Sequence, residues 1–224
     1  KQSHAKLWST GLLRLWPRND HVMPDVLSAV IFDLNGVFMQ SDRLSDRFRE
    51  ALGVPEEEFW PALKGALASA RLPDGPSVYD AMRPHLERWK VMLSRAAFFD
   101  FWFSGEREVP EMIALAQELR SHGLRVLILS NNFRERSEFY AGFPSIHAAV
   151  DHVYYSWETG YVKSDPRAYQ YMFEHERLSP DACAFFDDQE ANVRVAATLG
   201  MHAFVYDGIA VTRAKLRELG VDIP

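Results

Sequence analysis

Five short apolar runs, separated by stretches with helical periodicity, constrain the fold of this chain more than any other feature. Each run has the length of a strand and is apolar at nearly every position. They lie at 29–34, 124–129, 149–155, 183–186 and 203–206. Strands that are apolar on both faces are typical of a parallel sheet with helices on each side. The alternation therefore predicts an α/β protein built on a doubly wound parallel sheet.

Start and stop signals mark the helices between these runs. Pro110 stands at the start of one helical stretch and Gly123 just past its end. Asp165 and Pro166 are typical of an N-cap and a first helical residue, and Gly200 follows the end of another stretch. Glycine relieves the left-handed backbone that often ends a helix, and proline suits its first turn. We therefore expect helices after Pro110, after Asp165 and before Gly200.

The interval 41–104 interrupts the alternation because it contains no strand-like run. Its spacing of apolar residues and its proline and glycine breaks, including the segment 73–76, indicate about four short helices. Aromatic side chains then crowd together between residues 98 and 103. Such a cluster is typical of a hydrophobic interior or of an interface between two domains. We expect a small helical insertion whose aromatic residues pack inside it or against the sheet domain.

Composition and charge restrict the function. Of 224 residues, 47% are apolar and 25% are charged, as in ordinary globular proteins, and the net charge of −6 argues against nucleic acid as a partner. The longest apolar runs fall well short of the roughly 20 residues that span a bilayer, so we expect no membrane partner and a cytoplasmic location. The single cysteine, Cys183, lies within an apolar run and is predicted to be a buried thiol.

Residues 1–22 differ from the rest of the chain. Basic side chains precede the first acidic residue, Asp20, and a short apolar segment at 12–16 is interrupted by Arg14 and stopped by Pro17. This segment is too short for a secretory signal. We expect an N-terminal extension that is a tag, a leader or a docking segment.

Polar side chains follow four of the predicted strands. The carboxyl ends of parallel strands meet at one edge of a sheet, where ligands bind. In chain order, the residues expected there are Asp33, Ser130 with Asn131, Lys163, and the adjacent pair Asp187 and Asp188. Asp33, Ser130 with Asn131, and Lys163 each have an ordinary alternative role, as a turn former or helix cap, a helix cap and a solvated lysine respectively.

Taken together, these strand-end residues form a set with chemical meaning. A carboxylate can act as a nucleophile, a hydroxyl as a hydrogen-bond donor and an ammonium group as a clamp for a negative charge. Two adjacent carboxylates repel each other unless a cation offsets their charge. The combination is typical of metal-assisted phosphoryl transfer.

The segments that carry these residues resemble the motifs of the haloacid dehalogenase (HAD)-like hydrolases, in the order of that family. They are 31–37, 127–132, 160–169 and 185–193. The resemblance covers roughly residues 26–206. It implies a Rossmann-like core at 23–40 and 105–224, with a helical cap at 41–104 inserted after the first strand.

The resemblance also implies roles for individual residues. Asp33 would attack phosphorus and form an aspartyl-phosphate, while Ser130, Asn131 and Lys163 would bind the phosphoryl group of a small phosphorylated substrate. Mg²⁺ would be the cofactor. Its implied ligands are Asp33, the backbone carbonyl of Asn35, Asp188 and, directly or through water, Asp187. Asp165 and Tyr169 are expected to serve in capping and packing.

Asn35 is the main departure from the family pattern, because phosphatases of this family normally have an aspartate there as acid and base. An amide cannot transfer the proton, so the residue fits a slow phosphatase, a substrate with a good leaving group or an engineered trap. A 2-haloacid dehalogenase is one alternative, although the segment Asn35-Gly36-Val37 differs from the tyrosine-glycine-threonine usual in those enzymes. A non-catalytic protein that binds a ligand or a partner is another.

The oligomeric state is left as monomer or homodimer. Arg43, Arg47 and His85 are expected on solvated helix faces of the cap.

Overall fold

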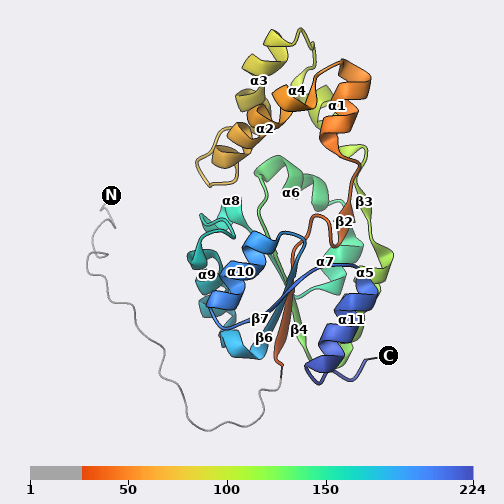
Figure 1. Cartoon of the computed structure of the whole chain (residues 1–224), viewed down its shortest axis with the longest axis vertical. Coiled ribbons are helices and arrows are strands. Elements are labelled where there is room, and N and C mark those ends of the chain that lie inside the picture. Colours follow the sequence, from red (N-terminus) through yellow and green to blue (C-terminus); the bar gives the residue numbers. More distant parts are fainter. Residues whose placement is uncertain (1–26, 224) are drawn as a thin grey trace, which may run out of the picture.

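The computed structural model describes residues 27–223, and its centre is a five-stranded parallel sheet (Figure 1). The strand order is β5-β4-β1-β6-β7. The strands are β1 Ala29–Phe32, β4 Arg125–Ser130, β5 His152–Tyr155, β6 Cys183–Asp187 and β7 His202–Val205. In β1, Ile31 pairs with Leu127 of β4 and with Phe185 of β6. The predicted α/β class with a doubly wound parallel sheet is confirmed.

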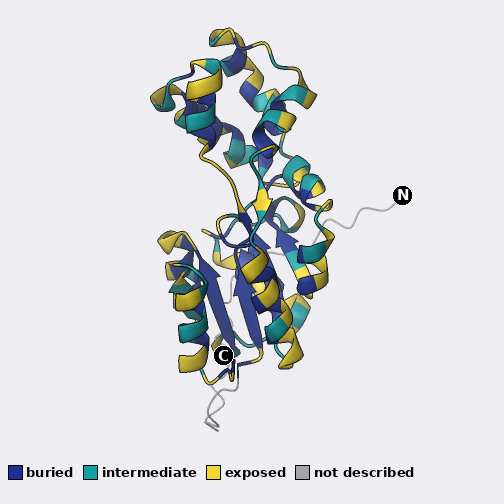
Figure 2. Cartoon of the chain, turned by 90° about the vertical axis from the view of Figure 1, so that its right-hand side faces the viewer, coloured by how far each residue is buried: buried dark blue, intermediate teal, exposed yellow. Residues whose placement is uncertain are grey.

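Helices cover both faces of the sheet, so its three central strands, β4, β1 and β6, are buried (Figure 2). They are α5 Pro110–Ser121, α6 Arg134–Tyr140, α7 Pro144–Ala149, α8 Ser156–Thr159, α9 Pro166–Glu176, α10 Glu190–Thr198 and α11 Ile209–Glu218, with a 3₁₀ turn at Pro180–Ala182. Val30 and Phe32 pack toward α5, α7 and α11, whereas Ala29 and Ile31 pack toward α9 and α10. Alternate side chains of a strand point to opposite faces, which explains why the runs are apolar throughout.

The expected helix signals and the buried thiol are present. The Asp165 carboxylate accepts a hydrogen bond of 2.9 Å from the Arg167 amide at the start of α9, and Gly123 and Gly200 have positive φ just after helices. Cys183 is fully buried. The predicted run 149–155 begins too early, because α7 extends through Ala149 and β5 starts only at His152.

Four helices lie between the first strand and α5, and we refer to them as the cap. They are α1 Leu44–Leu52, α2 Glu56–Ala70, α3 Val78–Arg88 and α4 Arg95–Phe103. The chain enters and leaves the cap through an antiparallel pair, β2 Met39–Gln40 and β3 Arg107–Glu108. Strands of two residues leave no periodicity to detect, so this pair was not predicted. The domain limits at 41 and 104 stay a prediction, and the extension at 1–22 lies outside the described residues.

The aromatic cluster serves both purposes that the sequence suggested. Phe98 is fully buried in the hydrophobic interior of the cap. Phe103 stacks on Phe139 of α6 with ring centroids 4.7 Å apart, and Trp102 lies 5.2 Å from Phe133. The cap is therefore packed onto the core beside α6. Within residues 27–223, no helix combines the length and apolar character needed to cross a membrane.

Candidate active site

Lys163 joins the ends of two neighbouring strands. Its Nζ lies 2.8 Å from Asp33 Oδ1, just after β1, and 2.6 Å from Asp187 Oδ2, at the end of β6. All three side chains are buried. Burial disfavours the charged lysine, but the charges of Asp33 and Asp187 outweigh this effect and raise the Lys163 pKa. The predicted surface alternative for Lys163 therefore does not apply.

Asp33 is held by one carboxylate oxygen only. Oδ1 accepts hydrogen bonds from the Leu34 amide, at 2.7 Å, and from Lys163. Among the residues that the structure describes, Oδ2 has no hydrogen-bond or ion-pair partner. Burial raises the pKa of Asp33, and the nearby Lys163 ammonium opposes that rise. The arrangement orients the carboxylate and leaves one oxygen available to a ligand.

Asp187 is the more completely bonded of the two acids. The Gln189 amide donates to its Oδ1 at 2.8 Å, and Asn192 Nδ2 lies 3.1 Å from each of its oxygens. With Lys163 on Oδ2, both oxygens have protein partners. Asp187 therefore positions Lys163 in this structure. Asn192 was not predicted as a site residue, although it lies within the fourth motif segment.

Asp188 faces the turn that follows β1. A Cβ on Gly36 would lie 2.7 Å from Asp188 Oδ2, and Gly36 has a φ of +84°, so glycine permits this close approach. Burial, followed by the charges of Asp33 and Asp187, raises the pKa of Asp188 to about 6. The rise is the expected response to burial and to neighbouring negative charges that the protein does not fully neutralise.

The three carboxylates form a group that can hold a metal ion. One oxygen of each of Asp33, Asp187 and Asp188 lies within 4.8 Å of the others. A single ammonium group, that of Lys163, offsets their charge in this cluster. Hard divalent cations prefer oxygen ligands of this kind. The donor set and the uncompensated charge therefore fit a divalent cation.

The last residue of β4 and the residues just after it contribute unpaired donors. Within the described part of the chain, the buried Ser130 Oγ and Asn132 Nδ2 have no hydrogen-bond partner. Asn131 Oδ1 accepts from the Lys163 backbone amide at 2.8 Å, so Asn131 supports the loop of that lysine. Helix α6 begins at Arg134 without a side-chain cap, which argues against the capping alternative. A ligand oxygen near Ser130 would satisfy its buried hydroxyl.

Asn35 belongs to a hydrogen-bond network that its position in the sequence did not indicate. Its Nδ2 donates to the Tyr140 hydroxyl at 2.5 Å, and that hydroxyl donates to Glu106 Oε2 at 3.0 Å. Arg136 donates to Glu106 Oε1 at 2.5 Å. The phenol has one proton, which it uses in the hydrogen bond to Glu106. The partner at position 35 therefore has to be a hydrogen-bond donor. The network matches an amide at this position.

The polar cap residues considered from the sequence make contacts within the cap. Arg43 pairs with Glu56 at 2.6 Å. Arg47 donates to the Trp102 carbonyl at 2.9 Å, and the His85 ring lies 5.8 Å from that of Trp89. Their roles are those of helix-surface and packing residues.

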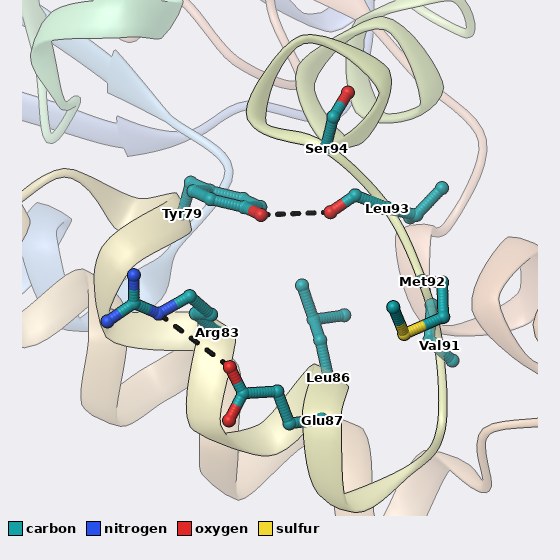
Figure 3. Close-up of a pocket in the computed structure, with 8 residues that line it drawn as sticks. All are labelled: Tyr79, Arg83, Leu86, Glu87, Val91, Met92, Leu93 and Ser94. Carbon is teal, nitrogen blue, oxygen red and sulfur yellow. Dashed lines mark hydrogen bonds and ion pairs between the residues drawn. The ribbon is translucent and has the colours of Figure 1, made fainter.

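An open pocket of about 310 Å³ lies at the surface of the cap, between α3 and the segment that leads into α4 (Figure 3). The Tyr79 hydroxyl donates to the Leu93 carbonyl across it at 2.9 Å. Arg83 and Glu87 pair with each other at 3.9 Å on the same helix. None of the strand-end residues lines this pocket. The convergent polar groups lie at the sheet edge instead.

Comparison with known families settles the membership of the chain. The family model for haloacid dehalogenase-like hydrolases matches residues 27–200. The chain belongs to the HAD-like hydrolases. This HAD-like hydrolase is 30% identical over 199 residues to phosphatase MT3486 of Mycobacterium tuberculosis, covering 84% of this chain and 90% of the relative.

Solved structures of HAD proteins have the same fold. A predicted HAD-like family hydrolase from Porphyromonas gingivalis is 25% identical, with a TM-score of 0.70, and the match covers 87% of this chain and 98% of that one. A HAD family enzyme from Bacteroides thetaiotaomicron, in complex with magnesium and inorganic phosphate, has a TM-score of 0.66 at 24% identity, covering 82% and 95%. The second likeness concerns the fold alone.

Proposed function

We propose that this HAD-like hydrolase cleaves small phosphomonoesters and that Asp33 is its nucleophile. The single observation that carries the proposal is the state of Asp33, whose Oδ1 is fixed by Leu34 and Lys163 while its Oδ2 is unpaired within residues 27–223. The name of the mycobacterial relative, a phosphatase, supports the same reaction class.

In the first step, Asp33 Oδ2 attacks phosphorus, the bond to the leaving alcohol breaks, and an aspartyl-phosphate forms. The Lys163 ammonium offsets the negative charge that gathers at the nucleophile and the phosphoryl group. The Ser130 hydroxyl donates a hydrogen bond to a phosphoryl oxygen, which supplies the partner that it lacks in the described structure. Asn131 keeps the Lys163 loop in place. Water then attacks the aspartyl-phosphate and releases phosphate.

Mg²⁺ is the cofactor that the donor set suits. Asp33, the backbone carbonyl of Asn35 and Asp188 would hold it, with Asp187 nearby and mainly engaged with Lys163. When bound, the ion supplies positive charge to the phosphoryl oxygens and lowers the barrier to attack by an anionic carboxylate.

Asn35 sets the expected speed of the reaction. Its amide holds no transferable proton, so the leaving alkoxide and the attacking water exchange protons with solvent. General acid-base help is typically worth about 10² to 10⁴ in rate, and the chain is expected to lack much of it. Substrates whose leaving groups need no proton should therefore be cleaved best.

The direct test is Mg²⁺-dependent phosphate release from a panel that includes an aryl phosphate and several alkyl phosphates. Asp33→Asn is the blank, because it removes the nucleophile with little change in size. We expect slow release above the blank, fastest with the aryl ester. Identical rates for both proteins on every compound would refute the phosphatase proposal.

A second function is favoured by the network around Asn35. Because Tyr140 donates to Glu106 and accepts from the amide, the site is well suited to an asparagine that takes no part in proton transfer. A protein that binds a phosphorylated ligand without turnover would have the same arrangement. Phosphate binding without release from any ester would select this function, and metal-independent halide release from 2-haloacids would select a dehalogenase. The cytoplasmic location and the choice between monomer and homodimer stay predictions.

A further inference from the structure

A loop of the cap lies against the core beside the candidate site. It comprises residues 71–77, after α2, and extends from the cap toward the core near α6 and α8 (Figure 1). Pro73 Cγ lies 3.9 Å from the position that a Cβ would take on Gly160, in the motif segment that carries Lys163. A cavity of about 390 Å³ separates this loop from Arg134 and Trp157 of the core.

Arg71, the first residue of this loop, is a cation without a partner. Its Nε is buried, and in the described part of the chain its guanidinium makes no hydrogen bond or ion pair. Burial lowers the pKa of Arg71, the like charge of Arg136 lowers it further, and only the Asp33 carboxylate opposes these effects. A half-buried guanidinium with an unpartnered Nε and a cation for a neighbour is costly to keep in a folded protein.

Arg136 is the nearby cation, and it is only partly satisfied. It pairs with Glu106, but its Nε is also buried without a partner among the described residues. Arg71 interacts with the charge of Asp33, yet no ion pair joins the two in residues 27–223. The two groups are therefore within electrostatic reach of each other without being paired. Lys163 is the cation that contacts Asp33 directly.

We propose that Arg71, with Arg136 beside it, binds a second anionic group of the substrate, which is separate from the phosphoryl group that Asp33 attacks. The inference rests on the proposed phosphatase function. A planar guanidinium binds phosphate or carboxylate oxygens through paired hydrogen bonds, and such an anion would offset the repulsion between the two arginines. The substrate class is thus small phosphomonoesters with a further phosphate or carboxylate on the same molecule.

Matched substrates test the inference through turnover. One pair is 3-phosphoglycerate and glycerol 3-phosphate, and a second is an alkane diol bisphosphate and its monophosphate. We expect a higher kcat/KM for the member with the second anion. Arg71→Gln should reduce this preference about ten- to a hundredfold, because this factor corresponds to the usual contribution of a charge-assisted hydrogen bond to binding. Comparison of the two pairs shows whether phosphate or carboxylate is preferred.

Binding tests the inference independently of turnover. Alkane bisphosphonates and phosphonocarboxylates of increasing spacer length are compared with methylphosphonate by calorimetry in the presence of Mg²⁺. At least one spacer should bind more tightly than methylphosphonate, and Arg71→Gln should abolish that advantage. If no ester is hydrolysed but this advantage is found, the phosphatase proposal fails while the anion site stands. If esters are hydrolysed and Arg71→Gln leaves both preferences unchanged, the anion site is refuted.

Thermal unfolding separates binding from a structural role. Arg83→Gln removes the same charge from an exposed position of the cap and is the matched control. Without ligand, Arg71→Gln should unfold at the same temperature as the parent chain or a higher one, because a half-buried charge that has no partner in residues 27–223 is removed. A lower unfolding temperature together with unchanged preferences would assign Arg71 a structural role and overturn the proposal.

Discussion

Replacement of Asn35 by aspartate should convert a slow site into a faster one, at a cost in stability. In the structure, the Asn35 amide donates a hydrogen bond to the Tyr140 oxygen at 2.5 Å, and the Tyr140 hydroxyl donates one to Glu106. A carboxylate at position 35 would place a third oxygen acceptor in a network that holds one phenol proton. Either the new carboxyl keeps its own proton, or one acceptor is left unpaired.

The magnitude follows from these two outcomes. A buried acceptor without a partner costs about 1–3 kcal/mol, so Asn35→Asp should lower the free energy of unfolding at pH 7 by about that amount. The same cost raises the pKa of the new carboxyl in the folded state. Its penalty is therefore largest at neutral pH and disappears as the pH falls below the ordinary aspartate range. A general acid also needs a carboxyl that keeps its proton. We therefore expect kcat on alkyl phosphates to increase by a factor of about 10² or more.

Urea unfolding at pH 7.5 and pH 4.5 measures the stability change, with Asn35→Ser as a control that places a smaller donor at this position. Phosphate release with Mg²⁺, from alkyl and aryl esters, measures the rate. The gain should be larger for alkyl esters, whose leaving groups need a proton. Unchanged rates, in a variant that still binds Mg²⁺ and phosphate, would show that proton transfer does not limit the reaction. If Asn35→Asp lowers the free energy of unfolding, relative to the parent chain, by the same amount at both pH values, the interpretation of the Tyr140 network is refuted.

Two further predictions concern the charges of the site. Lys163→Met leaves the carboxylate cluster without its cation and should lower the free energy of unfolding, measured in urea titrations, by about 3–5 kcal/mol. Mg²⁺ should restore part of the lost stability, and the exposed control Lys64→Met should leave the free energy of unfolding nearly unchanged. The pKa of Asp188 is raised to about 6, first by burial and then by Asp33 and Asp187, so the metal-free protein should lose stability as the pH rises from about 4, where the unfolded chain releases this proton, to about 6, where the folded protein releases it. Mg²⁺ replaces that proton, so its affinity should rise over the same interval, and thermal unfolding with and without Mg²⁺ checks both trends. A flat profile that matches Asp188→Asn would contradict this account.

Much of the fold and part of the candidate site could be predicted because they depend on local patterns. A buried parallel strand shows itself as a short apolar run, and the polar residue after it necessarily lies at one edge of the sheet. Asp33, Ser130 and Lys163 were found in this way, and the structure brings Asp33 and Lys163 into contact. The helix limits at Asp165 and Gly123 have equally local causes in capping and backbone conformation.

The remaining features depend on contacts between residues distant in the chain. Asn35 meets Tyr140, 105 positions away, only because α6 packs beside the turn after β1. Arg71 comes within electrostatic reach of Asp33 only because the cap folds back over the core. Periodicity reports which face of an element is buried, but not which element covers it. The sequence by itself therefore determined the strand-end carboxylate, hydroxyl and ammonium groups. The tertiary structure decided that position 35 suits a donor and that a cap arginine comes within electrostatic reach of Asp33.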